Sequence, residues 1–268
     1  MKKFIKINAI ILVIGFVLTI IGGALMVNYR SYFNGKTVSY VETLSADEIK
    51  DTSRLKIDAG FASLKIVAGD GFSLKADEVP EALAAHLEFS GDTAELKLDD
   101  FNGKDLLKSS GINVNSKGEY TLTVPEDMKF ENLSVDFYFG KLTAGDLRAE
   151  NADVQLSYSD SELNLGVCGN LNINTNFGDT DIDLGAEKLL KMTLSSNFGD
   201  CDIKNAVITG SASIGNSFGD MDVFLIGNDY DFYSSNAFGD IRTNGGNSSG
   251  SVKVEVSNAF GESDVSAN

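Results

Sequence analysis

Tryptophan is absent from this sequence, and its 268 residues include only 2 prolines, 2 cysteines and 1 histidine. Scarce proline beside 27 glycines is typical of a long sheet whose hydrogen-bond ladder is not interrupted. The cysteines, Cys168 and Cys201, are too few for a disulfide-rich scaffold and match no CxxC metal motif. The histidine, His86, lies in the apolar stretch VPEALAAHLEF, without the partners of a catalytic triad, a Cys–His dyad or a zinc site. We therefore expect no enzymatic activity and no cofactor.

Basic residues are also few: 22 lysines and arginines stand against 39 aspartates and glutamates, a formal net charge of −17. The first 30 residues hold four of the basic residues and no acidic one, so the remainder carries 18 basic against 39 acidic side chains. A body this acidic repels nucleic acid and anionic lipid, and it attracts cations or basic partners. We therefore expect no nucleic-acid partner.

Charge is missing altogether from Ile7 to Val27, a run of 21 residues that follows the basic start MKKFIK. About 20 apolar residues suffice for a helix to cross a bilayer core, and lysines before the run favour a cytoplasmic amino terminus. The sequence thus predicts a cytoplasmic stub at 1–6, a single transmembrane helix at 7–27 and an extracytoplasmic body. A signal peptide cleaved near Gly22-Gly23-Ala24 is the alternative, although the apolar part of a signal peptide is shorter.

The sequence does contain a repeat built around an aromatic residue. In five copies of the repeat the aromatic begins the tripeptide FGD or FGE. The aromatic positions are Phe139, Tyr158, Phe177, Phe198, Phe218, Phe238 and Phe260, at spacings of 19 to 22 residues. A self-similar period near 20 is typical of a solenoid. A leucine-rich repeat has a similar period, but its LxxLxLxxN pattern is absent apart from a loose echo at 163–168.

Apolar and polar residues alternate both before and after each aromatic, which predicts two short strands per coil with the FGD segment as the bend between them. We expect an all-β, parallel, right-handed β-solenoid of about 20 residues per coil. The aromatic should fill the inside of the bend and stack on its counterparts, the glycine should allow a close approach, and the aspartate should cap the turn. A ladder of stacked amides is expected from Asn176, Asn197, Asn216, Asn236 and Asn258. The two cysteines fall at different repeat positions, so we expect two free thiols.

Upstream of the regular repeat, the stretch GFASLKIVAGD has the same offsets and predicts an early coil. We divide the body into a linker or short helix within 28–52, an irregular amino-terminal β part at 53–130 and regular solenoid repeats at 131–268. Within the irregular part, FSLKA, HLEFS, AELKLDD and EYTLTVPED read as strands, and VPEALAAH reads as a short helix. The stretch AFGESDVSAN is expected to form the last coil of the stack, where unpaired backbone could support self-association.

The anchor, the early coil, the strand EYTLTVPED and the FGDxxI repeats together resemble the putative-adhesin family of bacterial extracytoplasmic β-solenoids. The resemblance runs from about Leu55 to the end of the sequence. It implies a role at the cell surface or in the envelope, and it brings no catalytic residues. The function of that family is largely undefined, and a fold does not settle a function.

Acidic residues recur two and four positions after the aromatic, as Asp179, Asp181, Asp200, Asp202, Asp220 and Asp222. Stacked coils would hold like charges about 4.8 Å apart, so a calcium ion between the columns would relieve their repulsion; the alternative is a solvated acidic face. Polysaccharide-degrading β-helices also carry such carboxylates, but they need basic residues nearby, which these columns lack apart from Lys141 and Arg242.

Two classes of function remain open. One is a membrane-anchored, adhesin-like binding or structural module of the envelope. The other is an accessory protein of an envelope-stress or signalling system that acts through a membrane partner, since the six residues predicted inside the cell are too few for a signalling domain. The sequence names no ligand for either.

Overall fold

A computed structural model describes residues 37–81, 84–98 and 118–268. Its elements are β1 (Thr37–Thr43), α2 (Ala46–Asp51), β2 (Arg54–Gly60), β3 (Ser63–Gly69), β4 (Ser73–Pro80), β5 (Ala85–Ser90), β6 (Thr93–Leu98), β7 (Glu119–Pro125), β8 (Lys129–Val167), β9 (Asn170–Asn176), β10 (Thr180–Asp183), β11 (Lys188–Asn197), β12 (Cys201–Asn216), β13 (Met221–Leu225), β14 (Tyr230–Asn236), β15 (Asp240–Asn244), β16 (Val252–Asn258) and β17 (Glu262–Ala267). All 17 strands belong to one hydrogen-bonded sheet, so the body is all-β as expected. The stub at 1–6 and the transmembrane helix at 7–27 lie outside the described residues. None of the described residues forms a helix long and apolar enough to cross a membrane.

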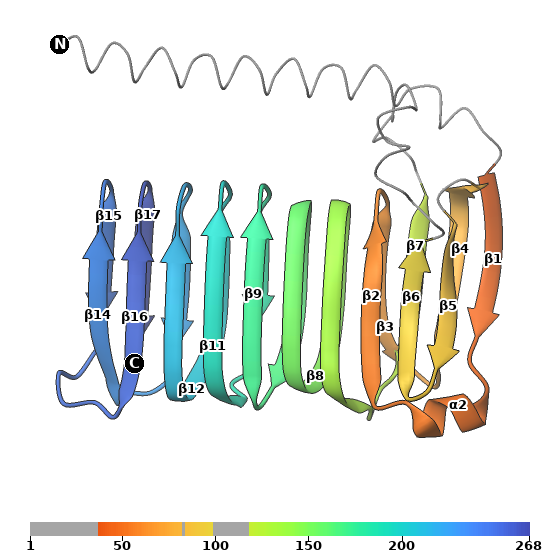
Figure 1. The fold of residues 1–268 in the computed structure, drawn as a ribbon, viewed down its shortest axis with the longest axis horizontal. Coiled ribbons are helices and arrows are strands. Elements are labelled where there is room, and N and C mark those ends of the chain that lie inside the picture. Colours follow the sequence, from red (N-terminus) through yellow and green to blue (C-terminus); the bar gives the residue numbers. More distant parts are fainter. Residues whose placement is uncertain (1–36, 82–83, 99–117) are drawn as a thin grey trace, which may run out of the picture.

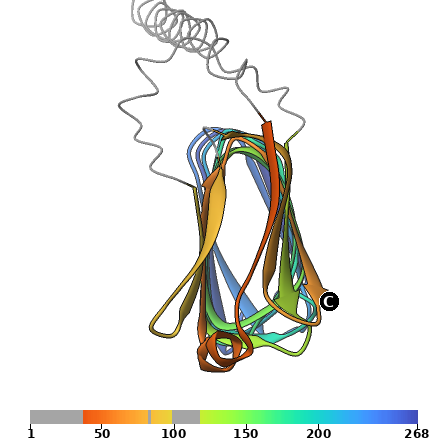
Figure 2. The ribbon, with the colours of Figure 1, turned by 90° about the vertical axis from the view of Figure 1, so that its right-hand side faces the viewer.

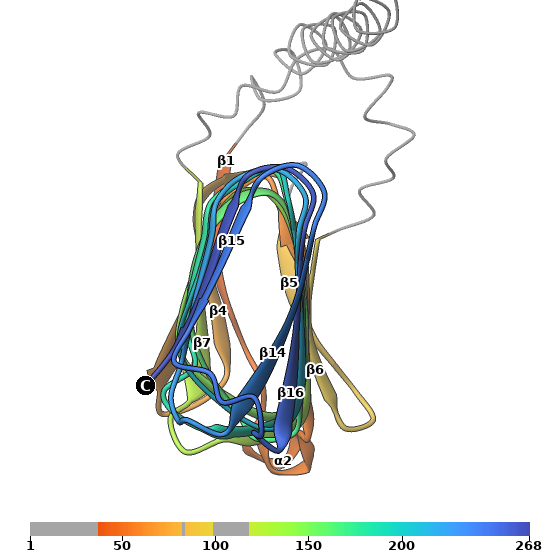
Figure 3. The same ribbon diagram turned by 90° about the vertical axis from the view of Figure 1, so that its left-hand side faces the viewer.

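The sheet winds around itself as a flattened solenoid with two long faces joined by turns at either side (Figure 2 and Figure 3). Neighbouring coils pair in parallel; Leu171 of β9, for example, pairs with Ala152 on one side and Met192 on the other. These apolar residues are buried because alternate side chains of each strand point between the two faces. The strict alternation in the sequence therefore becomes a single apolar core that runs the length of the stack.

The order of the coils departs from the order of the sequence at the carboxyl end (Figure 1). Strand β16 pairs with both β12 and β14, and β17 pairs with both β13 and β15. The coil made of β16 and β17 is therefore inserted between two earlier coils, and the outermost coil is made of β14 and β15. The expectation that AFGESDVSAN forms the last coil of the stack is wrong.

The side chains that point inward explain this exchange of places. In β16 the inward positions are Val252, Val254 and Val256, which are all buried. In β14 they include Phe232, which is half-buried, and Ser234, which is exposed. Placing the all-valine strand inside and the more polar strand outside buries more apolar surface, which stabilises the stack.

The early coil is present at the amino end, as the repeat offsets predicted. Leu55 of β2 pairs with Leu133 of β8, and Ile66 of β3 pairs with Ala144 of the same strand. Beyond this coil, β6 and β7 add in parallel, and β4, β1 and β5 then add antiparallel. The antiparallel strands end the solenoid at this side.

Two local expectations for the amino-terminal part need correction. The segment expected as a linker or short helix contains α2, which begins with a capping box of Ser45 and Glu48, but it also contains strand β1. The stretch VPEALAAH is mostly strand, since β4 continues to Pro80 and β5 begins at Ala85. Only Glu81 between them is in a 3-10 helix, and residues 82–83 lie outside the described residues. The strands extend into this stretch because β4 pairs with β1 and β5 pairs with β6.

Candidate functional site

A ladder of stacked aromatic rings runs along one side of the solenoid. In spatial order its members are Phe61, Phe139, Tyr158, Phe177, Phe198, Phe218, Phe260 and Phe238. From Phe139 to Phe260 the ring centroids are 4.6–4.8 Å apart and the planes lie within 8° of parallel. The predicted aromatic stack is confirmed.

From Tyr158 onward the rings are exposed and lie outside the bend rather than inside it, which corrects the sequence expectation; Phe61, at the amino end of the ladder, is buried. Phe198 is 47% exposed and has a φ of +60°, a left-handed conformation that turns its side chain away from the core. The inside of the bend is filled instead by small polar residues two positions earlier, such as Thr175, Ser196 and Asn216, all buried. The glycine after the ring is needed for close approach: a Cβ on Gly199 would overlap the carbonyl oxygen of Gly178 in the neighbouring coil.

The aspartates that follow the glycines link one coil to the next. The backbone N–H of Asp200 donates to Asp179 Oδ1 (3.4 Å), and that of Asp220 donates to Asp200 Oδ1 (3.0 Å). The N–H of Glu262 in turn donates to Asp220 Oδ1 (3.3 Å). The carboxylates face water as expected, but they accept from the adjacent coil instead of capping their own turn.

The predicted asparagine ladder exists in part. Asn197 Nδ2 donates to Asn176 Oδ1 (3.2 Å), which is an amide-to-amide step between coils. Asn216 and Asn258 are instead buried under the turns, where each amide nitrogen donates to two backbone carbonyls on adjacent coils. Asn236 Nδ2 donates to the carbonyl of Gly239. These inner asparagines hold the turns together.

We call the outward surface of β10, β13, β17, β15 and the 201–204 part of β12 the acidic face. Its in-register column contains Asp181, Asp202, Asp222 and Asp264. Partial burial, and then the negative charges of Asp181 and Asp222, raise the pKa of Asp202. Lys204 Nζ lies 3.3 Å from Asp181 Oδ1 and gives only local relief. At the carboxyl end, this face has a hollow of about 280 Å³.

The six carboxylates considered for calcium form two columns, one on the acidic face and one in the turns that directly precede it. Asp179, Asp200 and Asp220 form one, and each of them accepts a hydrogen bond from backbone of the next coil. Asp181, Asp202 and Asp222 form the other. Within the part of the chain that the structure describes, no three His, Cys, Asp or Glu side chains converge closely enough to hold a metal ion. Calcium binding stays a prediction.

We call the outward surface of β9, β11, β16, β14 and the 211–216 part of β12 the polar face. Its uncharged hydrogen-bonding side chains are Asn170, Asn172, Asn174, Asn176, Thr193, Ser195, Asn197, Ser211, Ser213, Tyr233, Ser235 and Ser257. They lie in register between coils; Thr193, for example, pairs with Asn172 and with Ser213. Lys191, Lys253 and Asp231 stand at the ends of these strands remote from the aromatic ladder. Glu255 lies nearer to the ladder, in register between Ser213 and Tyr233.

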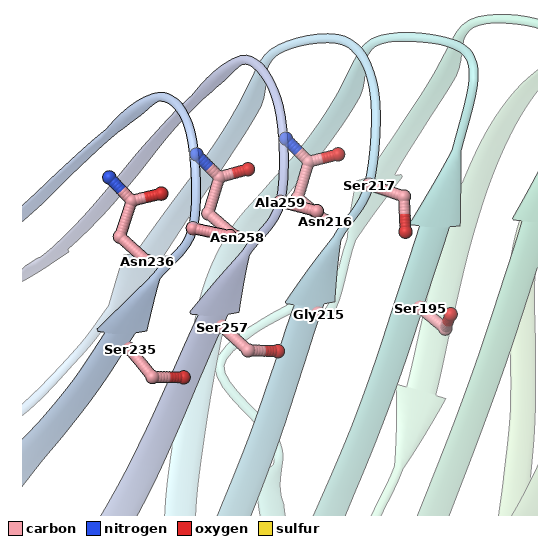
Figure 4. A pocket seen from close by; sticks show the side chains of 10 residues that line it. Ser195, Gly215, Asn216, Ser217, Ser235, Asn236, Ser257, Asn258 and Ala259 are labelled. Carbon is pink, nitrogen blue, oxygen red and sulfur yellow. The ribbon is translucent and has the colours of Figure 1, made fainter. Parts of the chain in front are cut away.

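Two shallow hollows mark the polar face. One, of about 440 Å³, lies beside the turns, where Ser235 and Ser257 project from adjacent strands and Gly215 separates Ser257 from Ser195 (Figure 4). The other, of about 550 Å³, lies further toward the amino end, and its lining includes Asn151, Asn170 and Asn172. The sequence reading missed this face. Its signal was present around Phe177 and Phe198, where the polar positions before the aromatic are Asn, Ser or Thr and those after it are Asp.

The two cysteines and the histidine lie apart from one another, each in contacts that belong to the fold. Cys201 is buried, and burial raises the pKa of its thiol to about 12. Cys168 is half-buried, with its Sγ 3.1 Å from Lys129 Nζ. Both thiols are free, as expected. His86 Nδ1 lies 2.7 Å from Glu42 Oε1, in a contact that joins β5 to β1.

Residues 52–268 match the model of a protein family described as Toastrack DUF4097. Among solved structures, the chain is similar to a putative cell adhesion protein from Clostridium sporogenes (14% identity over 87% of this chain and 100% of that one, TM-score 0.36). It is similar to a putative adhesin from Bacteroides fragilis (13% identity, 86% and 97% covered, TM-score 0.42) and to one from Parabacteroides merdae (13% identity, 88% and 97% covered, TM-score 0.36). Among curated proteins none matches.

Proposed function

The chain belongs to the Toastrack family DUF4097, and we propose that it is an adhesin-like binding module of the cell surface whose polar face holds an uncharged carbohydrate polymer. The observation that carries this proposal is the difference between the two long faces. One presents rows of carboxylates, and the other presents rows of amides and hydroxyls. The second is the less charged of the two, with Glu255 the charged side chain beside Ser213, and it offers the broader uncharged surface for a ligand.

The chemistry of the polar face suits sugar hydroxyls. Asparagine amides and serine or threonine hydroxyls can donate and accept hydrogen bonds, as a sugar hydroxyl also does. These groups sit on strands, so their positions are fixed by the sheet and little order has to be gained on binding. The acidic face and the net charge of −17 disfavour an anionic polymer near the protein.

A polymer is favoured over a single sugar because the face is periodic. Adjacent strands repeat about every 4.8 Å and offer similar groups from coil to coil. Each contact to an exposed hydroxyl or amide is weak, but contacts to linked sugars add as intramolecular events, which can raise the overall affinity by about 100-fold or more. The two hollows are shallow depressions along the polar face in which sugar units of the polymer could bind.

The proposal includes the anchor predicted at 7–27, which would hold the body outside the cell with the polar face accessible. Protease added to intact cells should then digest the body. A body that stays protected, while a known surface protein is cut, would contradict this location.

Ligand class can be tested with the full-length protein in detergent on immobilised polysaccharides that are uncharged, anionic or cationic. We expect retention on one or more uncharged polymers, with at least about tenfold weaker binding of the charged ones. The single sugars of a retained polymer should compete poorly. Retention on charged polymers alone, or on none of a broad set, would contradict the proposal.

A further inference from the structure

The outermost coil leaves part of the sheet edge open at the carboxyl end (Figure 3). Within the described residues, β14 pairs only with β16, and β15 pairs only with β17. At the opposite end, by contrast, β1 reaches across to β5: Glu42 Oε2 accepts from the N–H of Leu87 (2.7 Å), and Tyr40 Oη accepts from the N–H of Ala85 (2.9 Å). The two ends of the solenoid are therefore not equivalent.

The chain itself covers only the part of the open coil near Tyr230, at the end of β14 remote from the Phe238 turn. The N–H of Asn247 donates to the carbonyl of Tyr230 (2.7 Å), and Gly246 lies against the ring of Phe232. Toward the turn between β14 and β15, the residues from 234 to 240 are all exposed, and Phe238 at 68% is the most exposed ring of the ladder. Ile241 is only half-buried, whereas its neighbour Ser263 one coil inward is buried.

The charges of β15 are self-complementary. Asp240 and Arg242 both point outward, on either side of the inward Ile241. Arg242 makes a 3.5 Å contact with Glu262 and has further guanidinium donors to offer. In an antiparallel pair of two β15 strands centred on Ile241, each Arg242 lies opposite the Asp240 of the other copy, and the two Ile241 side chains meet.

We propose that this open coil binds the same coil of a second copy of the chain, with β15 pairing antiparallel to β15 about a two-fold axis at Ile241. A two-fold interface requires one surface patch that complements itself, and the Asp240–Ile241–Arg242 sequence meets that requirement. The pairing satisfies the open edge and covers the exposed end of the core.

The dimer would join two solenoids end to end. The axis that makes β15 meet β15 also makes β14 meet β14, so the polar faces of the two copies continue into one another. The amino-terminal strands β1 would then lie at the two far tips of the joined body (Figure 1). This inference does not depend on the proposed ligand, although a longer polar face would strengthen binding of a polymer.

The experiment is native mass spectrometry of the full chain released from detergent, over a concentration series, for the wild type, Asp240→Arg and Arg242→Asp. We expect a wild-type dimer. Each single variant places like charges opposite each other and should raise the dimer dissociation constant at least about tenfold. Both substituted side chains are exposed, so folding is not expected to suffer.

Two further samples make the test specific. The double variant Asp240→Arg with Arg242→Asp restores both pairs and should dimerise, and an equal mixture of the two single variants should form the mixed dimer. Lys204→Asp changes a charge on the same face away from the edge and should leave the dimer intact. A wild type that is monomeric throughout, or a dimer that neither single variant at 240 or 242 weakens, would overturn the proposal.

Discussion

Phe218 and Phe260 are separated by a complete further coil of the chain, yet their ring centroids lie 4.8 Å apart with the planes 8° from parallel. Phe238, which falls between them in the sequence, stacks on the far side of Phe260 at 5.2 Å. The order of the rings thus follows the exchange of the last two coils, and it makes Phe238 the last ring of the ladder at the carboxyl end.

This order predicts which ring matters more for stability. Phe260→Ala removes two stacking contacts and should lower the free energy of unfolding by about 1–3 kcal/mol, while Phe238→Ala removes one and should cost about 0.5–1.5 kcal/mol. Urea denaturation of both variants measures the difference. A larger loss for Phe238→Ala would contradict the observed coil order.

The glycines of the turns should be sensitive to a single added methyl group. Gly219 has a φ of +116°, and a Cβ there would overlap the carbonyl oxygen of Gly199, so Gly219→Ala should destabilise the fold by about 2–4 kcal/mol. Gly145 is the matched control, because a Cβ built there meets nothing within 4 Å. Gly145→Ala should be neutral or slightly stabilising. Thermal melts in which both variants lose equally would show that close approach is not what selects glycine.

The acidic column predicts a pH dependence with a definite sign. Partial burial and the charges of Asp181 and Asp222 raise the pKa of Asp202 above its ordinary 3.8, so this carboxyl stabilises the fold when protonated and loses that contribution as pH rises through its folded-state pKa. Asp202→Asn should therefore raise the melting temperature at pH 7 and lose this advantage near pH 3. An advantage that persists unchanged at pH 3 would contradict the electrostatic explanation.

Asp183 serves as the opposite case on the same face. Hydrogen bonds from the Asn205 amide and from the N–H of Gly185 lower the pKa of Asp183, so its carboxylate stabilises the fold above the ordinary pKa and this contribution is lost as pH falls. Asp183→Asn should lower the melting temperature at pH 7, and the difference should close at low pH.

Part of this fold could be predicted from the sequence. The period near 20 and the strict alternation were sufficient for the solenoid, the aromatic stack and the early coil, because each depends on local spacing alone. The exchange of the last coils depends on a comparison of inward residues between strands: Val252, Val254 and Val256 against Phe232 and Ser234. The period is the same for either order, so the spacing could not distinguish them.

The outward position of the rings was hidden for another reason. Five of the eight ring residues have a left-handed backbone, Phe61, Phe139, Tyr158, Phe177 and Phe198, and such a conformation is rare for aromatic residues. A reading based on period two therefore placed them inside. The polar face was missed because only the acidic columns were considered as a ligand surface.

Calcium binding can be decided by comparing two ions. If the two columns of carboxylates hold calcium, millimolar calcium should raise the melting temperature of the full chain more than equal magnesium does, by binding the folded state. The paired change Asp200→Asn with Asp202→Asn should remove that difference. Identical responses to both ions would leave only screening of the like charges.

The most direct test of the account compares the two faces as binding surfaces. Thr193 and Ser213 pair in register at the centre of the polar face, and Thr193→Glu with Ser213→Glu adds two charges there. Thr143→Glu with Asn164→Glu adds the same two charges to outward positions of β8 on the other side of the core. Binding of the full chain to a retained uncharged polysaccharide, measured by surface plasmon resonance, should fall at least about tenfold for the first pair and stay within about twofold for the second. Equal losses for both pairs, or a loss for the second alone, would contradict the polar face as the binding surface.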